Sequence, residues 1–259
     1  MEQKNCKQCG QTGEGNFCQA CGEAYHQHRI TLKHMLHEAA HLITHLDKGF
    51  FYSLKAIVTR PGTTPREYID GRRKDHQKPF SMFFLCGTIA ALCLYWINTG
   101  TDKLHHDKIS HEEEHFYQHY FVLLQMALVP LYALVNRLIY YKSKYNYAEF
   151  LVVLLYNTAF LYIILVFVNC LKLAFGQFET GFIEAGVVLA YNLITYINFF
   201  REDKRWLIIL KVFMTTIICF FISKYATDLF IEIFLNKKGE LISDNQMLNT
   251  CSLMLQYVV

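Results

Sequence analysis

The 259-residue sequence predicts an all-α membrane protein with about five transmembrane helices, which follow a small cysteine-rich knuckle and an amphipathic helix. Three observations lead to this fold class. Hydrophobic residues make up 53% of the chain, more than a water-facing fold of this size usually carries. After Pro79 these residues gather in long apolar stretches with short charged breaks. Four of the nine cysteines lie in two close pairs within the first 21 residues.

Changes in composition divide the chain into four segments. Residues 1–28 form the knuckle, and residues 29–78 hold a cytoplasmic amphipathic helix and a basic segment next to the membrane. Residues 79–235 form the transmembrane helical bundle, and residues 236–259 form a C-terminal tail. The net charge of +3 is too small for the concentrated basic footprint of a nucleic-acid-binding protein. We therefore expect no nucleic-acid partner.

The knuckle contains two CxxCG motifs, Cys6 to Gly10 and Cys18 to Gly22. Zinc prefers four thiolates in a tetrahedron, and each CxxC turn offers two of them. A redox motif would need one pair alone. The spacing therefore predicts a structural zinc site whose four ligands leave no open position for catalysis: Cys6, Cys9, Cys18 and Cys21. So short a module suits a structural role or contact with a cytoplasmic protein partner.

Residues 31–47 follow a helical pattern with apolar residues on one face and histidines on the other. This predicts a helix that lies at the membrane interface or packs on the bundle. It contains the sequence His37-Glu38-Ala39-Ala40-His41, in which two histidines could hold zinc while Glu38 acts as general base. A membrane metalloprotease at residues 37–41 is therefore one hypothesis. A histidine-rich polar face is the simpler interpretation, since no third ligand is identifiable.

A second HExxH pattern runs from His111 to His115. Ser110 and Glu113 form a capping box, which explains the acidic residues as a solvated helix start. The alternative is a second metal site at His111 and His115, which would suit a divalent-metal transporter or sensor.

A helix needs about 20 apolar residues to cross a bilayer. The apolar pattern of the last stretch, which begins at Trp206, continues through Lys224 and Asp228 to Leu235. This stretch is the least certain span, so the number of spans, four or five, stays open. The expected spans are Pro79–Thr101, Tyr120–Ile139, Phe150–Leu171, Gly181–Phe200 and Trp206–Phe221.

Basic residues predict the orientation of these spans. The segments before span one, between spans two and three, and between spans four and five are rich in Lys and Arg, and they share one side. Short basic loops face the cytoplasm. The N-terminus also lacks the apolar segment of a signal peptide. We therefore expect a cytoplasmic N-terminus and, in a five-span chain, an external C-terminus.

The segment before the first span combines helix breakers with basic residues. Two prolines and a glycine in residues 60–65 end the preceding helix. Basic residues beside the membrane attract anionic lipid by about 1 kcal/mol each. The alternative is a specific headgroup or ligand contact made by Arg66, Tyr68, Arg72 and Arg73.

This order of motifs resembles an uncharacterised bacterial family of multi-pass membrane proteins with a domain of unknown function. The family has an N-terminal CxxCG…CxxCG knuckle, a short Asp-x-Gly-Phe helix and a Pro-Gly…Arg-x-Tyr-Ile-x-Gly-x-Arg segment before its first span. The matching residues are Cys6, Cys9, Cys18, Cys21, Asp47, Gly49, Phe50, Pro61, Gly62, Arg66, Tyr68, Ile69, Gly71 and Arg73. The resemblance implies zinc, this topology and the bacterial inner membrane, and it implies no activity.

Middle parts of the expected spans carry amides and hydroxyls rather than charges. Such groups suit hydrogen bonds between helices, whereas an ion pathway usually needs intramembrane charge. We therefore interpret the chain as a non-catalytic membrane scaffold or regulator with a structural zinc site. The metal transporter or sensor and the metalloprotease are the alternatives, and an oligomer is compatible with each of them.

Overall fold

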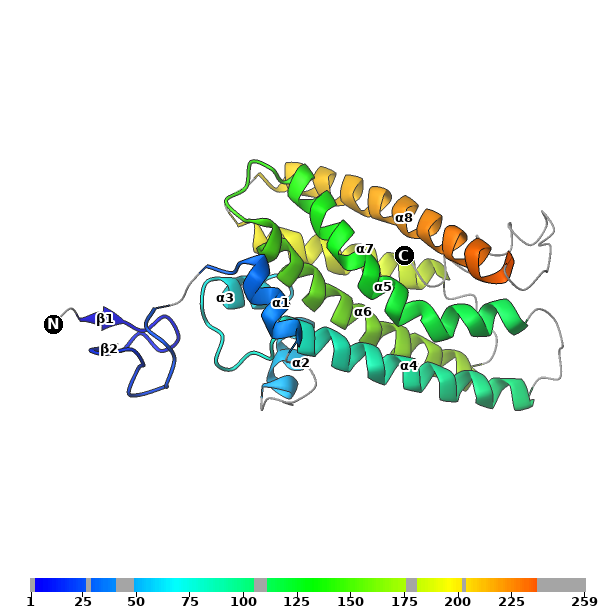
Figure 1. Cartoon of the computed structure of the whole chain (residues 1–259), viewed down its shortest axis with the longest axis horizontal. Coiled ribbons are helices and arrows are strands. Elements are labelled where there is room, and N and C mark those ends of the chain that lie inside the picture. Colours follow the sequence, from blue (N-terminus) through cyan, green and yellow to red (C-terminus); the bar gives the residue numbers. More distant parts are fainter. Residues whose placement is uncertain are drawn as a thin grey trace.

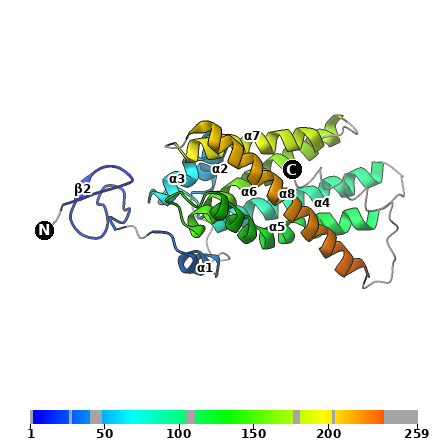
Figure 2. The ribbon, with the colours of Figure 1, turned by 90° about the horizontal axis from the view of Figure 1, so that it is seen from above.

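The computed structural model describes residues 3–26, 29–40, 49–104, 111–175, 181–201 and 204–236. Five long helices form a bundle, and a small N-terminal unit projects from one end of it (Figures 1 and 2). Helices α1 (Leu32–Ala40), α2 (Phe50–Thr59) and α3 (Thr63–Ile69) lie at the same end. The N-terminal unit pairs strand β1 (Lys4–Asn5) with strand β2 (Thr12–Gly13) in antiparallel register.

Each expected span lies within or close to one helix of the bundle. Three of these helices contain stretches long and apolar enough to cross a membrane: Pro79–Ile97, Tyr147–Leu171 and Arg205–Phe230. The described apolar stretches of the other two are shorter, Leu124–Ile139 and Ala185–Phe199. The all-α membrane fold class is thus confirmed. The bundle helices are α4 (Pro79–Leu104), α5 (His111–Ile139), α6 (Tyr147–Phe175), α7 (Gly181–Phe199) and α8 (Arg205–Asn236).

Helix α6 is the centre of the bundle and packs against α4, α5 and α7. In its apolar stretch 67% of the residues are buried, against 22% in that of α8. Helix α8 instead exposes large apolar side chains such as Leu210, Ile217 and Phe221. Such side chains are stable on a lipid-facing surface and would be unfavourable in water. The polar ends and apolar flanks of the bundle therefore fit a bilayer.

Two prolines shape the connection between α2 and α3. A proline has no N–H, so Pro61 and Pro65 leave the carbonyls of Ile57 and Pro61 without their helical donors. Helix α7 supplies both missing donors. The hydroxyl of Tyr191 donates to the Ile57 carbonyl over 3.0 Å, and the side-chain amide of Asn198 donates to the Pro61 carbonyl over 2.9 Å.

Gly62 lets the α2–α3 connection lie directly on the backbone of α7. Its φ of +77° is in the left-handed region, which other residues adopt at a cost. A Cβ atom there would lie 2.0 Å from the carbonyl oxygen of Thr195. The prolines predicted the helix break here, but no local pattern indicated that α7, more than a hundred residues later, would supply the missing donors.

The described part of the expected amphipathic helix is α1, and residues 41–48 lie outside the described residues. Met35 is fully buried against the bundle, whereas Leu32 and Leu36 are 45% and 61% exposed. His34 and His37 are also exposed. The helix therefore packs on the bundle along a narrow line and keeps apolar side chains at the surface, as an interfacial helix does.

Gly62→Ala should destabilise the protein by at least about 2 kcal/mol, because the new methyl group forces α7 away and strains the backbone. Thermal unfolding in detergent measures the change. The control is Gly186→Ala within α7, where a Cβ meets nothing within 4 Å; better helix propensity makes it neutral or stabilising. Equal melting temperatures for the two variants would contradict the close packing of Gly62 on α7.

Candidate functional site

The N-terminal unit contains an internal repeat of 12 residues, which gives two equivalent loops with two cysteines each. The amide of Cys6 donates to the Gln11 carbonyl and that of Cys18 to the Glu23 carbonyl. Likewise the amide of Gly10 donates to Cys6 and that of Gly22 to Cys18. Both glycines have positive φ, +78° and +73°, which explains why glycine follows each CxxC.

The two loops bring the four cysteines together around one centre. All four Sγ atoms lie within 4.8 Å of one another. The Cys6–Cys21 and Cys9–Cys18 Sγ pairs, one from each loop, are 3.5 and 3.6 Å apart. A tetrahedral zinc ion with Zn–S bonds of about 2.3 Å would separate its sulfurs by about 3.8 Å. The arrangement therefore fits a single metal ion with four thiolate ligands.

Two of the four thiols, those of Cys18 and Cys21, have pKa values shifted in opposite directions. A backbone hydrogen bond at Cys21 is the largest effect on Cys18 and lowers the pKa of that thiol to about 6. At Cys21 a backbone hydrogen bond at Glu23 acts to lower the pKa, but burial and the three neighbouring thiols outweigh it and raise the pKa to about 12. A divalent cation at the centre would relieve this crowding and favour the thiolate at every position.

Glu23 ties the second metal loop to the segment that leads into α4. Its carbonyl accepts the amide of Cys18, while its carboxylate Oε2 accepts the backbone amide of Lys74 over 2.9 Å. Glu23 is 6% exposed, so this charge-assisted bond is shielded from water. A second contact joins Gln8 of the first loop to Asp75, from Nε2 to Oδ2.

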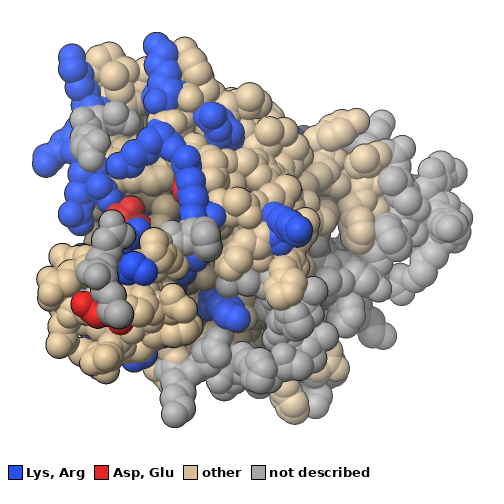
Figure 3. Space-filling view, turned by 60° about the vertical axis from the view of Figure 1, so that its left-hand side comes forward, with Lys and Arg blue, Asp and Glu red and all other residues tan. Residues whose placement is uncertain are grey.

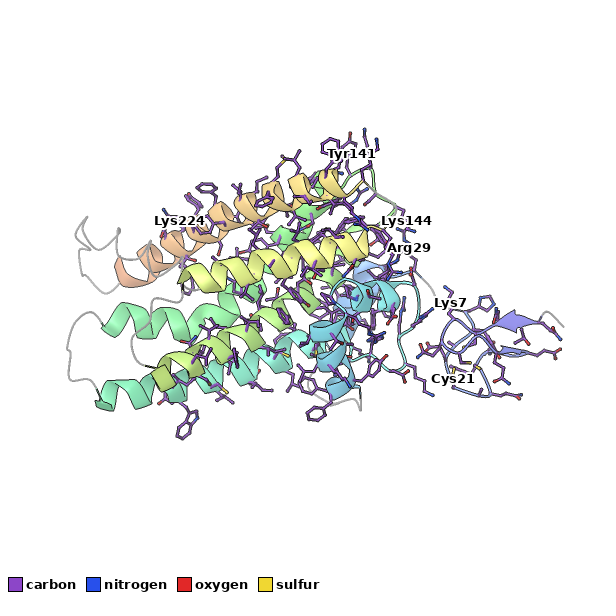
Figure 4. All side chains as sticks on the ribbon, turned by 180° about the vertical axis from the view of Figure 1, so that it is seen from behind. Lys7, Cys21, Arg29, Tyr141, Lys144 and Lys224 are labelled. Atoms are coloured by element: carbon purple, nitrogen blue, oxygen red, sulfur yellow. The ribbon has the colours of Figure 1, made fainter. Side chains whose placement is uncertain are left out.

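Arg29, just after the N-terminal unit, fixes the start of α1 to the start of α6. Its guanidinium donates to both carboxylate oxygens of Glu149, at 2.8 and 2.9 Å, and this ion pair raises the pKa of Arg29. Glu149 also forms a reciprocal capping box with Asn146 at the start of α6. Asn146 in turn donates to the Ile30 carbonyl. Figure 4 places Arg29 beside Lys144 at this end of the bundle.

The bundle end that carries the N-terminal unit is strongly basic, and we call it the basic end. Figure 3 shows Lys and Arg gathered around a shallow hollow on this side of the molecule. The segment before α4 and the α5–α6 and α7–α8 connections all contribute to it, as the sequence predicts. Its exposed cations include Arg60, Arg72, Lys74, Lys78, Lys142, Lys144, Arg201, Lys204 and Arg205.

Three of the four residues expected to contact a lipid headgroup are buried or half-buried by internal contacts. Tyr68 is 3% exposed, Arg66 donates to the carbonyl of Phe199 at the end of α7, and Arg73 stacks over the Tyr68 ring at 5.5 Å. Arg72 alone of the four has a mostly exposed side chain. The headgroup contact itself stays a prediction, with Arg72 as its accessible member.

Glu67 is a central residue of the basic end that the sequence reasoning did not single out. Its carboxylate lies 3.5 Å from Arg60, 3.7 Å from Arg72 and 3.5 Å from His76. It therefore joins the end of α2, the α3–α4 connection and a buried imidazole. The sequence signal was an acid within a basic segment that also holds Asp70 and Asp75, and such acids suggest counter-ions for the basic residues.

The histidine hypotheses fall largely outside the described part of the chain. His37 is exposed on α1, but His41 and the side chain of Glu38 lie outside the described residues. His111 and His115 begin α5, and their side chains are likewise outside it. Among the residues that the structure describes, the four cysteines are the group with metal-binding geometry. Both histidine sites stay predictions.

One comparison with known proteins gives a match. Residues 47–91 match the model of a family described as a protein of unknown function (DUF3667). The matched part holds α2, α3, the basic connection and the first turns of α4, and does not include the cysteine motifs. No curated protein and no solved structure matches the chain significantly.

The buried His76 predicts a pH dependence of the basic end. Burial lowers its pKa, although the Glu67 carboxylate acts to raise it. In the unfolded chain His76 takes up a proton near its ordinary pKa of 6.5, whereas in the folded protein it takes up the proton only at lower pH. Lowering the pH below about 6.5 therefore favours unfolding and reduces stability.

We expect the melting temperature in detergent to fall between about pH 7.5 and pH 5.5, and to fall less in His76→Gln. His34→Gln, an exposed histidine on α1, is the control and should keep the wild-type response. The same pH response in His76→Gln and wild type would contradict the role of burial at His76.

Proposed function

We propose that this chain is a non-catalytic membrane scaffold or regulator, in which structural zinc holds the N-terminal unit rigid on the cytoplasmic end of the bundle. The convergence of four cysteine sulfurs carries the proposal. Because the protein supplies four thiolates, a tetrahedral ion would have no position left for water or substrate. Such a site stabilises a fold and presents a surface rather than performing hydrolysis.

The charge distribution supports a cytoplasmic location for this end. The starts of α4, α6 and α8 lie at the basic end with the N-terminal unit. Lys and Arg in short connections are retained on the cytoplasmic side of a membrane. A cytoplasmic location would also keep the thiols reduced and able to bind metal. We assign the protein to the bacterial inner membrane on this basis and on its resemblance to bacterial proteins.

The surface of the N-terminal unit offers a contact for a cytoplasmic protein. Phe17, directly before Cys18, is 65% exposed, while its backbone is held by a bridge to Ala24. A rigid, exposed aromatic side chain is a frequent anchor of protein interfaces. Metal binding at Cys18 would fix the position from which this ring projects.

Metal analysis of the purified full chain tests the zinc site. We expect one zinc ion per chain in the wild type and none in a variant with all four cysteines, Cys6, Cys9, Cys18 and Cys21, changed to Ser. Cys170→Ser, an exposed cysteine of α6, is the matched control and should keep its zinc. Zinc retained in the fourfold variant would contradict the assignment and point to histidine ligands.

A photocrosslinking amino acid in place of Phe17 tests the partner contact in cells. We expect crosslinks to a discrete cytoplasmic protein that disappear in the fourfold cysteine variant, because the loop that carries position 17 loses its fixed shape. The same amino acid in place of Phe51, which is 78% exposed on α2, should give a pattern that the cysteine changes leave intact. Position-17 crosslinks that survive the loss of zinc would contradict a metal-dependent interface.

A further inference from the structure

A cavity of about 120 Å³ lies inside the bundle where α5, α6, α7 and α8 converge. We call it the amide cavity, because side-chain amides from three of these helices line it: Gln125 and Asn136, Asn157, and Asn192. Thr215 and Thr216 of α8 add hydroxyl groups. None of its lining residues is charged. The cavity is separate from the metal site and the basic end.

Gln125 is the unusual member of this lining. It is 8% exposed, yet within the described part of the chain its amide has no hydrogen-bond partner. Water is scarce within a bilayer, so a polar side chain on the wall of a cavity there gains from a hydrogen-bonding group in the cavity. The Gln125 amide lines the cavity and can therefore form hydrogen bonds with a polar group that enters it.

The neighbouring amides are only partly used. The Asn157 amide donates to the Asn192 side-chain oxygen over 3.0 Å, and among the described residues the Asn157 oxygen and the Asn192 NH₂ group form no further hydrogen bond. Asn136, by contrast, donates to the Tyr132 carbonyl and accepts the Tyr196 hydroxyl. Hydrogen-bond donors and acceptors of Gln125, Asn157 and Asn192 are thus available to a bound group. At Asn136 the side-chain amide is already hydrogen-bonded within the protein.

The remaining walls are apolar, with Leu161, Val188 and Phe220 among them. A site with apolar walls and a few unpaired polar groups is typical of small-molecule pockets. The absence of charge in the lining disfavours ions, carboxylates and phosphates, because a charge would be desolvated there without a counter-charge. The volume resembles that of protein cavities that accept one benzene ring, about 150 Å³.

We propose that the amide cavity binds an uncharged group of about the size of one six-membered ring, which both donates and accepts hydrogen bonds. Gln125, Asn157 and Asn192 would bind its polar side, and the apolar walls would enclose the rest. The group can belong to the head of an uncharged lipid or to a small water-soluble molecule, since both present the same chemistry to the cavity.

Three probes of similar size test this chemistry in the detergent-solubilised full chain. Benzamide is uncharged and carries a hydrogen-bond donor and an acceptor. Benzoate has nearly the same shape but is negatively charged. Toluene has neither a charge nor a hydrogen-bonding group. Ligand-observed NMR and the rise in melting temperature report binding. We expect benzamide to bind at least about tenfold more tightly than benzoate or toluene. A cavity that holds water alone would give no benzamide binding, which would overturn the proposal.

Two variants place the binding in the cavity. Gln125→Leu should weaken benzamide binding roughly five- to tenfold, while leaving the melting temperature nearly unchanged, because Leu has a similar size and replaces a buried polar group by an apolar one. Val188→Phe should abolish binding by filling the space. The control is Asn169→Leu, a buried amide of α6 outside the cavity whose Nδ2 bonds its own helix; its benzamide affinity should match the wild type. Unchanged binding in Gln125→Leu and Val188→Phe would overturn the proposal.

Competition identifies the natural source. Addition of an organic extract of the cell membranes, or of the soluble small-molecule fraction, should displace benzamide from the wild type. Displacement by the membrane extract supports an uncharged lipid head, and displacement by the soluble fraction supports a free small molecule. If neither fraction displaces benzamide, the cavity has no natural ligand of this class and the proposal is wrong.

Discussion

Unpaired backbone carbonyls are costly where water is excluded, and this constraint determines the basic end of the molecule. Pro61 and Pro65 turn the chain sharply before the first long helix, and each removes one helical donor. The turn is therefore stable only where Tyr191 and Asn198 of α7 meet the two carbonyls. Gly62 allows the approach, because any side chain there would collide with the α7 backbone. The position of α2 and α3 thus depends on α7.

The N-terminal unit is attached to the segment between α3 and α4. Gln77 is held from two sides, by Ser53 on its amide and by Tyr156 on its carbonyl, so the segment before α4 has a fixed path. Glu23 then binds the amide of Lys74 in the same segment. The Arg29–Glu149 pair contributes less than its geometry suggests, because the Arg29 side chain is 58% exposed and exposed pairs are screened by water. The shielded Glu23 bond is the stronger link between the second cysteine loop and the basic end.

Local patterns predicted what local geometry determines. The cysteine spacing predicted the four-sulfur cluster, and apolar length predicted the bundle helices. The partners of Pro61, Glu23 and Arg29 escaped prediction, because each depends on a contact between residues far apart in the sequence. The spacing of Asn146 and Glu149 is typical of a capping box. No local pattern, however, indicated that Arg29 binds the Glu149 carboxylate. Amides within the spans were expected to join helices; Asn157 and Asn192 do so, whereas Gln125 faces a cavity.

Hydrogen–deuterium exchange of the Lys74 amide, with and without bound metal, tests most directly whether the metal site is coupled to the membrane end. This amide donates to Glu23, whereas that of Gln77 donates to the buried Ser53 hydroxyl and serves as an internal reference. If zinc orders the loop that carries Glu23, a chelator should speed exchange at Lys74 by about tenfold or more and leave Gln77 unchanged. Equal protection of Lys74 in the two states would contradict the coupling.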